Sequence, residues 1–219
     1  MSRIALIHAT MLSIAPVNDA FASLWPQAEL VHLLDDSLSR DRAEGKETSG
    51  RIFALADYAV STKADAILYS CSAFGEAISL VQGRMEIPVF KPNEAMFDSA
   101  FEKGPNIAML ATFIPSIKSM EKEFYETAPT GISTGTGAAG ASVTTTFVKG
   151  AREASDSGNQ DLHNKLIAGA AASLHGYDAI MLAHFSMSTA SELCEEATHI
   201  PILTAPDSAV RKIQTYFQD

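Results

Sequence analysis

Cysteine is scarce in this 219-residue chain, which contains only Cys71 and Cys194. Two cysteines cannot form a disulfide framework, so the sequence predicts a cytoplasmic protein with reduced thiols. Cations are also few, because 16 Lys and Arg stand against 26 Asp and Glu and leave a net charge of −10. Nucleic acids and anionic membranes need clustered cations, and the composition therefore disfavours both as partners. A small anionic substrate responds only to the local field of a site and is not disfavoured.

Long hydrophobic runs are absent as well. The most apolar stretch, residues 166–185, is interrupted by three polar side chains, namely His175, Asp178 and His184, so no transmembrane helix is predicted. The N-terminal residues lack a small-residue cleavage site, and no signal peptide is expected. With 47% hydrophobic residues, the chain can bury the core of one large domain or two small ones.

Short apolar runs alternate with longer amphipathic segments, which predicts parallel strands covered by helices. Strands are predicted at residues 4–8, 29–34, 66–70, 89–91, 107–111, 179–183 and 202–204. Helices are predicted at residues 16–24, 41–62, 94–102, 116–127, 161–174, 189–196 and 207–217. The Gly- and Thr-rich stretch 129–146 is expected to hold a loop and one weak strand near 132–136.

One pattern occurs twice in the chain. Residues 64–75 read ADAILYSCSAFG and residues 177–188 read YDAIMLAHFSMS, at an offset of 113 that carries Cys71 onto His184. The repeat predicts two pseudo-symmetric Rossmann-like (flavodoxin-like) α/β halves, each a three-layer unit with a mainly parallel four-stranded sheet. The N-terminal half is expected at 1–95 plus 206–219 and the C-terminal half at 96–205, with the active site in the cleft between them.

Residues 135–140 match the pattern G-x-G-x-x-G. A dinucleotide-binding loop follows the first strong strand and precedes a strand that ends in an acidic residue. Here the preceding run is polar, so we interpret the glycines as a flexible connection. No spacing among His, Cys, Asp and Glu is typical of a closed metal site. The sequence therefore offers neither a dinucleotide-binding nor a metal-binding motif.

Ligands of parallel α/β sheets bind at the carboxyl ends of the strands. The polar residues that follow predicted strands there are His8, Thr10, Asn18, Ser70, Cys71, Ser72, Thr112, Ser116, His184 and Ser186. We expect the active site to be built from this set.

Cys71 and His184 are the strongest catalytic candidates. Free cysteine often only packs in a core, an interpretation that suits Cys194 within its helix. Cys71 instead ends a buried strand between two serines, where the following helix N-terminus is expected to lower the thiol pKa. Facing strand ends would place Cys71 and His184 on opposite walls of one cleft, as proton transfer across a substrate requires. His8 is either a second acid/base or a structural residue.

The other histidines, His32, His163, His175 and His199, are interpreted as surface or turn residues.

In the order and spacing of several short segments the chain resembles the aspartate/glutamate/hydantoin racemase superfamily, whose members include glutamate and allantoin racemases, maleate isomerase and arylmalonate decarboxylase. The segments are residues 8–10 with Pro16, 70–75 (SCSAFG), 94–96 (EAM), 110–112 with Ser116, and 182–184 (LAH). The resemblance implies a cofactor-free enzyme that binds a small carboxylate between its halves. Members commonly form dimers, which suggests a homodimer.

By the resemblance, Cys71 is the acid/base of the first half. Hydroxyls and backbone N–H groups for the substrate carboxylate would come from Ser72, Ala73, Thr112, Phe185 and Ser186. The second cysteine of the racemases is replaced by His184, which can serve as acid or base near neutral pH. The leading expectation is a racemase or epimerase that moves the α-proton of an amino acid or hydantoin. A cysteine-dependent decarboxylase, a cis–trans isomerase, a Cys-His hydrolase and a non-catalytic carboxylate-binding protein remain as alternatives.

Overall fold

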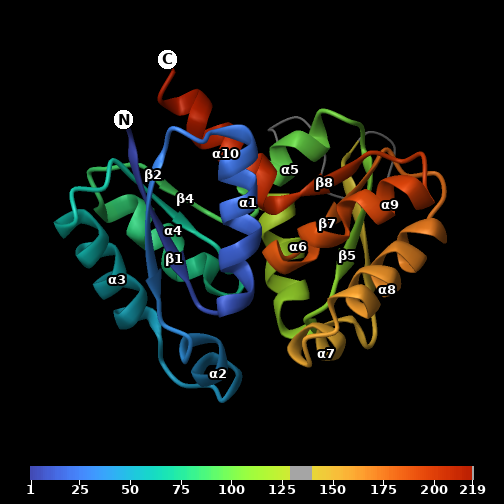
Figure 1. Cartoon of the computed structure of the whole chain (residues 1–219), viewed down its shortest axis with the longest axis horizontal. Coiled ribbons are helices and arrows are strands. Elements are labelled where there is room, and N and C mark those ends of the chain that lie inside the picture. Colours follow the sequence, from blue (N-terminus) through green and yellow to red (C-terminus); the bar gives the residue numbers. More distant parts are fainter. Residues whose placement is uncertain (129–139, 219) are drawn as a thin grey trace.

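The computed structural model describes residues 1–128 and 140–218, which form two four-stranded sheets with every pair of neighbouring strands parallel (Figure 1). The first sheet has the order β2-β1-β3-β4, with β1 at Arg3–His8, β2 at Glu29–Leu34, β3 at Ala66–Tyr69 and β4 at Val89–Phe90. The second has the order β6-β5-β7-β8, with β5 at Asn106–Ala111, β6 at Ser142–Phe147, β7 at Ala179–Leu182 and β8 at Ile202–Thr204. The two sheets share one strand order, which confirms the predicted α/β fold with two similar halves.

Strand β6 was not among the predicted strands, and the weak strand expected near 132–136 lies outside the described residues. The run Ser-Val-Thr-Thr-Thr-Phe of β6 is polar because β6 is the edge strand of its sheet and stays partly exposed. An apolar run marks a strand buried on both faces, so this criterion misses such an edge strand. The repeat offset of 113 carries β2 onto β6 residue for residue and was the signal that could have found it.

The helices of the first half are α1 at Ile14–Leu24, α2 at Leu38–Ala43, α3 at Ser49–Ser61, α4 at Gly75–Arg84 and α5 at Glu94–Phe101. The single helix predicted for residues 41–62 is wrong, since α2 and α3 are separate. Gly45 follows the end of α2 with φ +75°, the left-handed conformation that commonly terminates a helix. The break leaves α2 as a short element beside the carboxyl ends of β1 and β3.

The helices of the second half are α6 at Ile114–Thr127, α7 at Ala151–Asp156, α8 at Gln160–Ala172 and α9 at Ser191–Ala197, and the chain ends with α10 at Ala205–Tyr216. Short 3₁₀ turns follow three strands or their loops: η1 at Met11–Ser13, η2 at Ser72–Phe74 and η3 at Phe185–Ala190. Within 1–128 and 140–218, no helix combines the length and the apolar character needed to cross a membrane.

A common apolar core joins the two halves. It contains Leu6 and Phe21 of the first half together with Met109 and Leu182 of the second, all at most 2% exposed. Helix α10 packs against α1 and α5, as Figure 1 shows at the upper centre. The predicted boundaries at 1–95 plus 206–219 and 96–205 stay a prediction. The shared core holds the two sets of strand ends in a fixed relation.

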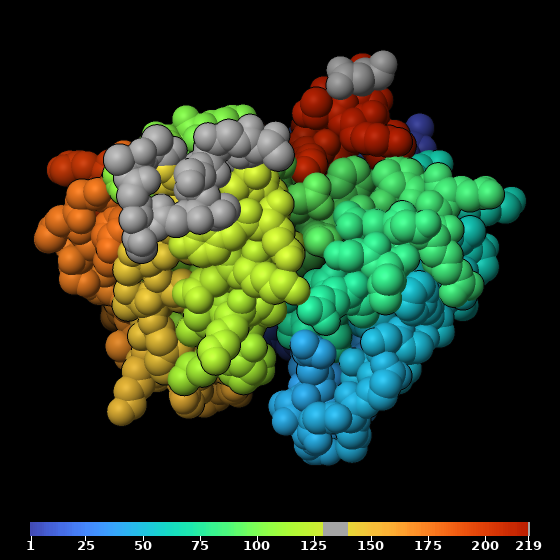
Figure 2. Space-filling view, turned by 180° about the vertical axis from the view of Figure 1, so that it is seen from behind, coloured from blue at the N-terminus to red at the C-terminus, as the bar shows by residue number. Residues whose placement is uncertain are grey.

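The carboxyl ends of β1, β3, β5 and β7 lie at one edge of the molecule. Figure 1 shows α2 and α7 at this lower edge, one from each half. The surface seen from behind is hollowed between the α2 segment and the start of α6 (Figure 2).

Candidate active site

A cavity of about 70 Å³ lies between the two halves at the carboxyl ends of the strands. Nine residues predicted from the sequence line it: Thr10, Ser70, Cys71, Ser72, Ala73, Thr112, His184, Phe185 and Ser186. The structure thus brings Cys71 and His184 to one cavity, from corresponding strand ends of the two halves. Both adopt the same extended backbone conformation, with φ −124° and −117°.

Three predicted residues do not reach the cavity wall. His8 is fully buried behind it, Asn18 sits half-buried in α1, and Ser116 is buried beside His184. A strand-end position places a residue at the correct edge of the sheet. For His8 it does not determine which side of the backbone the side chain occupies. Asn18 and Ser116 lie beyond the strand ends, within helices α1 and α6, where the direction of a side chain depends on how the helix packs.

The Cys71 side chain stands at the end of β3, where the chain turns into η2. Burial raises the thiol pKa, while the Ala73 N–H, the Ser39 side chain, Arg152 and Arg42 partly oppose that effect. The expected lowering of this pKa is therefore wrong, because desolvation outweighs the donors around the sulfur. At neutral pH Cys71 is a thiol and thus a proton donor.

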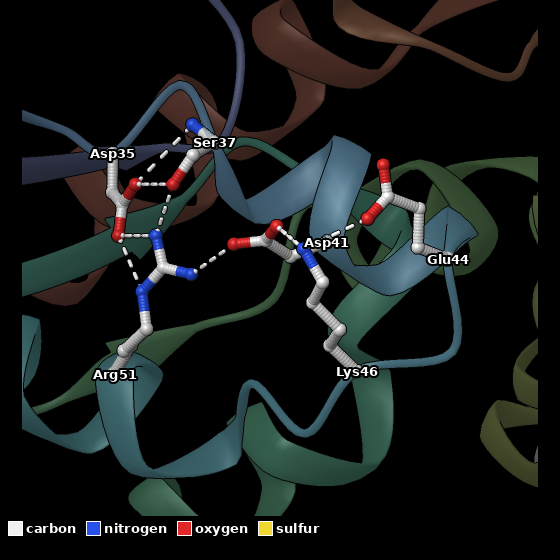
Figure 3. A network of polar contacts seen from close by, with 6 residues as sticks. All are labelled: Asp35, Ser37, Asp41, Glu44, Lys46 and Arg51. Atoms are coloured by element: carbon white, nitrogen blue, oxygen red, sulfur yellow. Dashed lines mark hydrogen bonds and ion pairs between the residues drawn. The ribbon is translucent and has the colours of Figure 1, made fainter.

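Ser39 reaches Cys71 from α2, and a charged network holds α2 in place (Figure 3). Arg51 of α3 donates from Nε to Asp35 at 2.8 Å and from Nη1 to Asp41 at 2.6 Å. Burial pushes the pKa of Asp35 upward, but hydrogen bonds from Arg51 and Ser37 outweigh it and leave the pKa lowered. The network connects the loop after β2, helix α2 and helix α3, and so fixes the segment that covers the thiol.

Both ring nitrogens of His184 are hydrogen-bonded within the protein. The backbone N–H of Thr112 donates to Nδ1 at 3.4 Å, and the Thr112 hydroxyl lies 3.2 Å from the same atom. Because a backbone N–H can only donate, Nδ1 carries no proton and Nε2–H faces Ser116 Oγ at 2.9 Å. Ser116 in turn donates to the Phe113 carbonyl at 2.8 Å. A Cys71–His184 dyad of the hydrolase type is therefore not formed.

Burial lowers the pKa of His184 to about 4, and Arg152 and His163 add to this effect. The imidazole is therefore neutral at neutral pH. Its Nδ1 lone pair is reached through the Thr112 hydroxyl, which itself lines the cavity. The Thr112 hydroxyl thus lies between the cavity and the His184 ring.

Nine further residues line the cavity that the strand-end rule did not select: Leu12, Ser13, Ser39, Asn93, Phe113, Arg152, Ser155, His163 and Ala183. The offset of 113 carries α2 onto α7 and Ser39 onto Arg152. The repeat was thus the sequence signal that could have placed Ser39 and Arg152 at corresponding positions of the two halves.

His163 was predicted at the surface, and this is wrong. It lies on α8 at 1% exposure, where its Nδ1–H donates to the Ala151 carbonyl at 2.8 Å. Its Nε2 is an acceptor with no partner among the described residues. A histidine on a polar helix face gives no sequence signal for its direction, so only packing revealed this position.

Arg152 is the only charged side chain among the described residues that line the cavity. Its guanidinium lies 4.4 Å from the centroid of the Phe113 ring and 3.4 Å from the Asp156 carboxylate. The Phe113 ring and the Asp156 carboxylate hold the guanidinium at the cavity wall, and Asp156 itself does not line the cavity. The acidic chain thus presents a local positive site.

Within 1–128 and 140–218, no three His, Cys, Asp or Glu side chains group in a way that could hold a metal ion. The G-x-G-x-x-G segment at 135–140 begins outside the described residues.

Solved racemase structures share the fold of this chain. Glutamate racemase from Bacillus anthracis matches with a TM-score of 0.74 and 14% identity, covering 99% of this chain and 82% of that one. Allantoin racemase from Pseudomonas fluorescens matches with 0.70 and 16%, covering 99% and 91%. Aspartate racemase from Picrophilus torridus matches with 0.69 and 13%, covering 94% and 90%. No protein-family model matches the sequence, and no curated protein does.

Proposed function

We propose that this protein is a cofactor-independent isomerase of the racemase or epimerase type, which moves the α-proton of a small carboxylate such as an amino acid or a hydantoin. One observation carries the proposal. A thiol and a hydroxyl–imidazole pair, Cys71 and Thr112–His184, line one small cavity from matching strand ends of two similar halves. The shared fold with glutamate, aspartate and allantoin racemases supports the same reaction class.

The substrate carboxylate is bound by the guanidinium of Arg152. Backbone N–H groups at the starts of η2 and η3, near Ser72 and Phe185, supply further donors, because the first N–H groups of a helical turn lack partners within it. Loss of the α-proton converts the carboxylate into an enediolate with more negative charge on its oxygens. Donors fixed around those oxygens stabilise that species more than the substrate.

Proton transfer then uses the two walls. The α-proton passes to Thr112 Oγ1 as the hydroxyl proton moves to His184 Nδ1, which forms an imidazolium. The Cys71 thiol delivers a proton to the opposite face of the carbon and becomes a thiolate. In the reverse direction the thiolate removes the proton and the imidazolium returns one through Thr112. The resting thiol and neutral imidazole are the protonation states that the first direction requires.

Incubation in D₂O with both enantiomers of glutamate, aspartate and allantoin, and with other amino acids and hydantoins, tests the proposal. NMR should detect α-deuterium uptake with at least one substrate, accompanied by interconversion of enantiomers. Uptake should disappear in Cys71→Ala and in His184→Ala, whereas Cys194→Ala keeps it because Cys194 is a core residue. Absence of exchange with every substrate would contradict the proposal.

A second candidate, decarboxylation of a substituted malonate, is favoured by the raised pKa of Cys71. A decarboxylase needs only one proton donor to quench the enediolate, and both His184 nitrogens already have protein partners. Release of carbon dioxide from substituted malonates distinguishes it. That activity should require Cys71 but survive His184→Ala in part.

A further inference from the structure

A chain of polar side chains leads from the molecular surface to the cavity. His32 Nδ1 lies 3.0 Å from His8 Nε2. His8 Nδ1 lies 2.8 Å from Ser70 Oγ and 3.1 Å from Ser13 Oγ, and the two hydroxyls are 2.8 Å apart. Every link is within hydrogen-bonding distance.

The two ends of this chain differ in their access to solvent. His32 is exposed on the edge strand β2, whereas His8 ends β1 and is fully buried. His32 pairs in register with Leu6, so His32 and His8 lie on the same face of the sheet. Ser13 and Ser70 line the cavity, and Ser70 precedes Cys71. The buried imidazole therefore connects solvent on one side to the cavity on the other.

The hydrogen bonds permit two arrangements of protons. In one, His32 Nδ1–H donates to His8 Nε2, and His8 Nδ1–H donates to Ser70. In the other, His8 Nε2–H donates to His32, and the Ser70 hydroxyl donates to His8. Burial, with a smaller effect from His32, lowers the pKa of His8 to about 4, so His8 is neutral in both arrangements. A neutral imidazole that accepts at one nitrogen and donates at the other can pass a proton without holding a charge.

We propose that His32, His8 and Ser70 form a proton wire between bulk solvent and the cavity beside Cys71. An acid in solvent protonates His32 Nε2 while the Nδ1 proton of His32 moves to His8 Nε2. The Nδ1 proton of His8 moves to Ser70 Oγ, and the Ser70 hydroxyl proton enters the cavity. Both imidazoles end neutral with their protons shifted from Nδ1 to Nε2. The reverse shift carries a proton outward.

The claim that the wire delivers its proton to Cys71 rests on the proposed function. Each time the Cys71 thiol protonates an enediolate, a thiolate remains inside a cavity whose walls are largely buried. Desolvation disfavours that thiolate, which must regain a proton before the next turnover in the same direction, just as the His184 imidazolium must release the proton it took from the substrate. The wire supplies that proton.

The first test needs no substrate. In ¹⁵N-labelled protein, the ring N–H of His8 should exchange with water faster than a fully buried group allows, and His32→Phe should slow this exchange by at least about tenfold. His32→Asn is the decisive variant, because an amide can keep the hydrogen bond to His8 but cannot relay a proton. If the wire exists, the ring N–H of His8 should exchange as slowly in His32→Asn as in His32→Phe. His175→Phe, at another exposed histidine, should leave the exchange unchanged.

A purely structural network predicts the opposite, namely that His32→Asn exchanges like the parent protein. That result would overturn the proposal. Amide spectra of each variant show whether it folds. If His32→Phe does not fold, His32→Asn can still be compared directly with the parent protein.

The second test uses turnover. With any substrate that the protein converts, His32→Asn should lower kcat by at least about tenfold and leave kcat/KM nearly unchanged, because only the resetting of Cys71 is slowed. Added imidazole should restore kcat by acting at the exposed gap left by His32. An equal loss in kcat and kcat/KM without rescue would contradict the wire. If the parent protein converts no substrate, the proposed function fails, and the exchange test still decides the wire.

Discussion

Desolvation dominates the chemistry of the single residues around the cavity. It keeps Cys71 protonated and His184 neutral. Donors and cations near the thiol oppose the effect of burial on the Cys71 pKa, whereas Arg152 and His163 add to the effect of burial on the His184 pKa. Alkylation of Cys71 in the ligand-free protein should therefore have a pH midpoint above the ordinary value of 9.0. A Cys194→Ala background makes the reaction specific.

Since Arg152 lowers the thiol pKa, Arg152→Gln should move the alkylation midpoint higher still. A midpoint at or below 9.0 in the parent protein would contradict the raised pKa of the thiol.

The hydroxyl of Thr112 is expected to carry the proton between substrate and His184 Nδ1. Thr112→Val removes that hydroxyl but retains the backbone N–H bond to the ring. Deuterium exchange should fall by about 100-fold, as for loss of a general acid/base, whereas Thr112→Ser should retain most of it. Exchange by the Val variant at the parent rate would show that His184 reaches the substrate without Thr112.

Arg152 should determine the affinity for anionic substrates. Arg152→Gln is expected to raise KM by about tenfold or more, since hydrogen bonds to charged groups are among the stronger ones. Arg42→Gln is the matched control, because the Arg42 guanidinium packs over Phe74 and does not line the cavity. Equal effects of the two substitutions would point to the general field of the protein instead of a direct contact.

At the scale of elements, short helices complete the site that the strands begin. Helix α2 brings Ser39 to Cys71 and is held by Arg51, which bridges Asp35 and Asp41 (Figure 3). Arg51→Met should speed amide hydrogen exchange in α2 several-fold while the amides of β1 and β3 keep their protection.

The matched control is Arg84→Met, which removes an exposed ion pair with Asp57 far from α2 in sequence. It should leave α2 exchange unchanged. If Arg51→Met also left it unchanged, packing alone would hold the helix.

At the scale of the whole molecule, buried neutral histidines should make the fold sensitive to acid. The pKa of His8 falls from 6.5 in the unfolded chain to about 4 in the folded one. Between these values the unfolded state binds more protons, so stability is full above pH 6.5 and is lost as the pH falls toward 4. The shift corresponds to about 3 kcal/mol, to which His184 adds a loss in the same window.

Urea unfolding at pH 7 and pH 4 measures this loss. In His8→Asn the difference in unfolding free energy between the two pH values should shrink by about 3 kcal/mol. His175→Asn should not change it, because His175 is exposed. An unchanged pH dependence in His8→Asn would mean that His8 is protonated in the fold near its ordinary pKa.

The amino-acid sequence alone determined the positions of seven of the eight described strands, the strand-end location of Cys71 and His184, and the internal repeat. These features depend on local composition, because a strand buried on both faces needs an apolar run wherever it sits. The repeat offset also carries β2 onto β6 and Ser39 onto Arg152. It thus extends to a polar edge strand and to the short helix α7, which have no apolar pattern of their own.

Only the tertiary structure decided where the side chains point and what surrounds them. It buried His8 behind the cavity wall, placed His163 at that wall, and bonded both His184 nitrogens to Thr112 and Ser116. Burial in the tertiary structure also raises the pKa of the Cys71 thiol, whereas the sequence led us to expect a lowered pKa. The physical reason is that direction, hydrogen-bond partners and desolvation depend on atoms distant in sequence, such as Ser116 beside His184, and no local pattern encodes them.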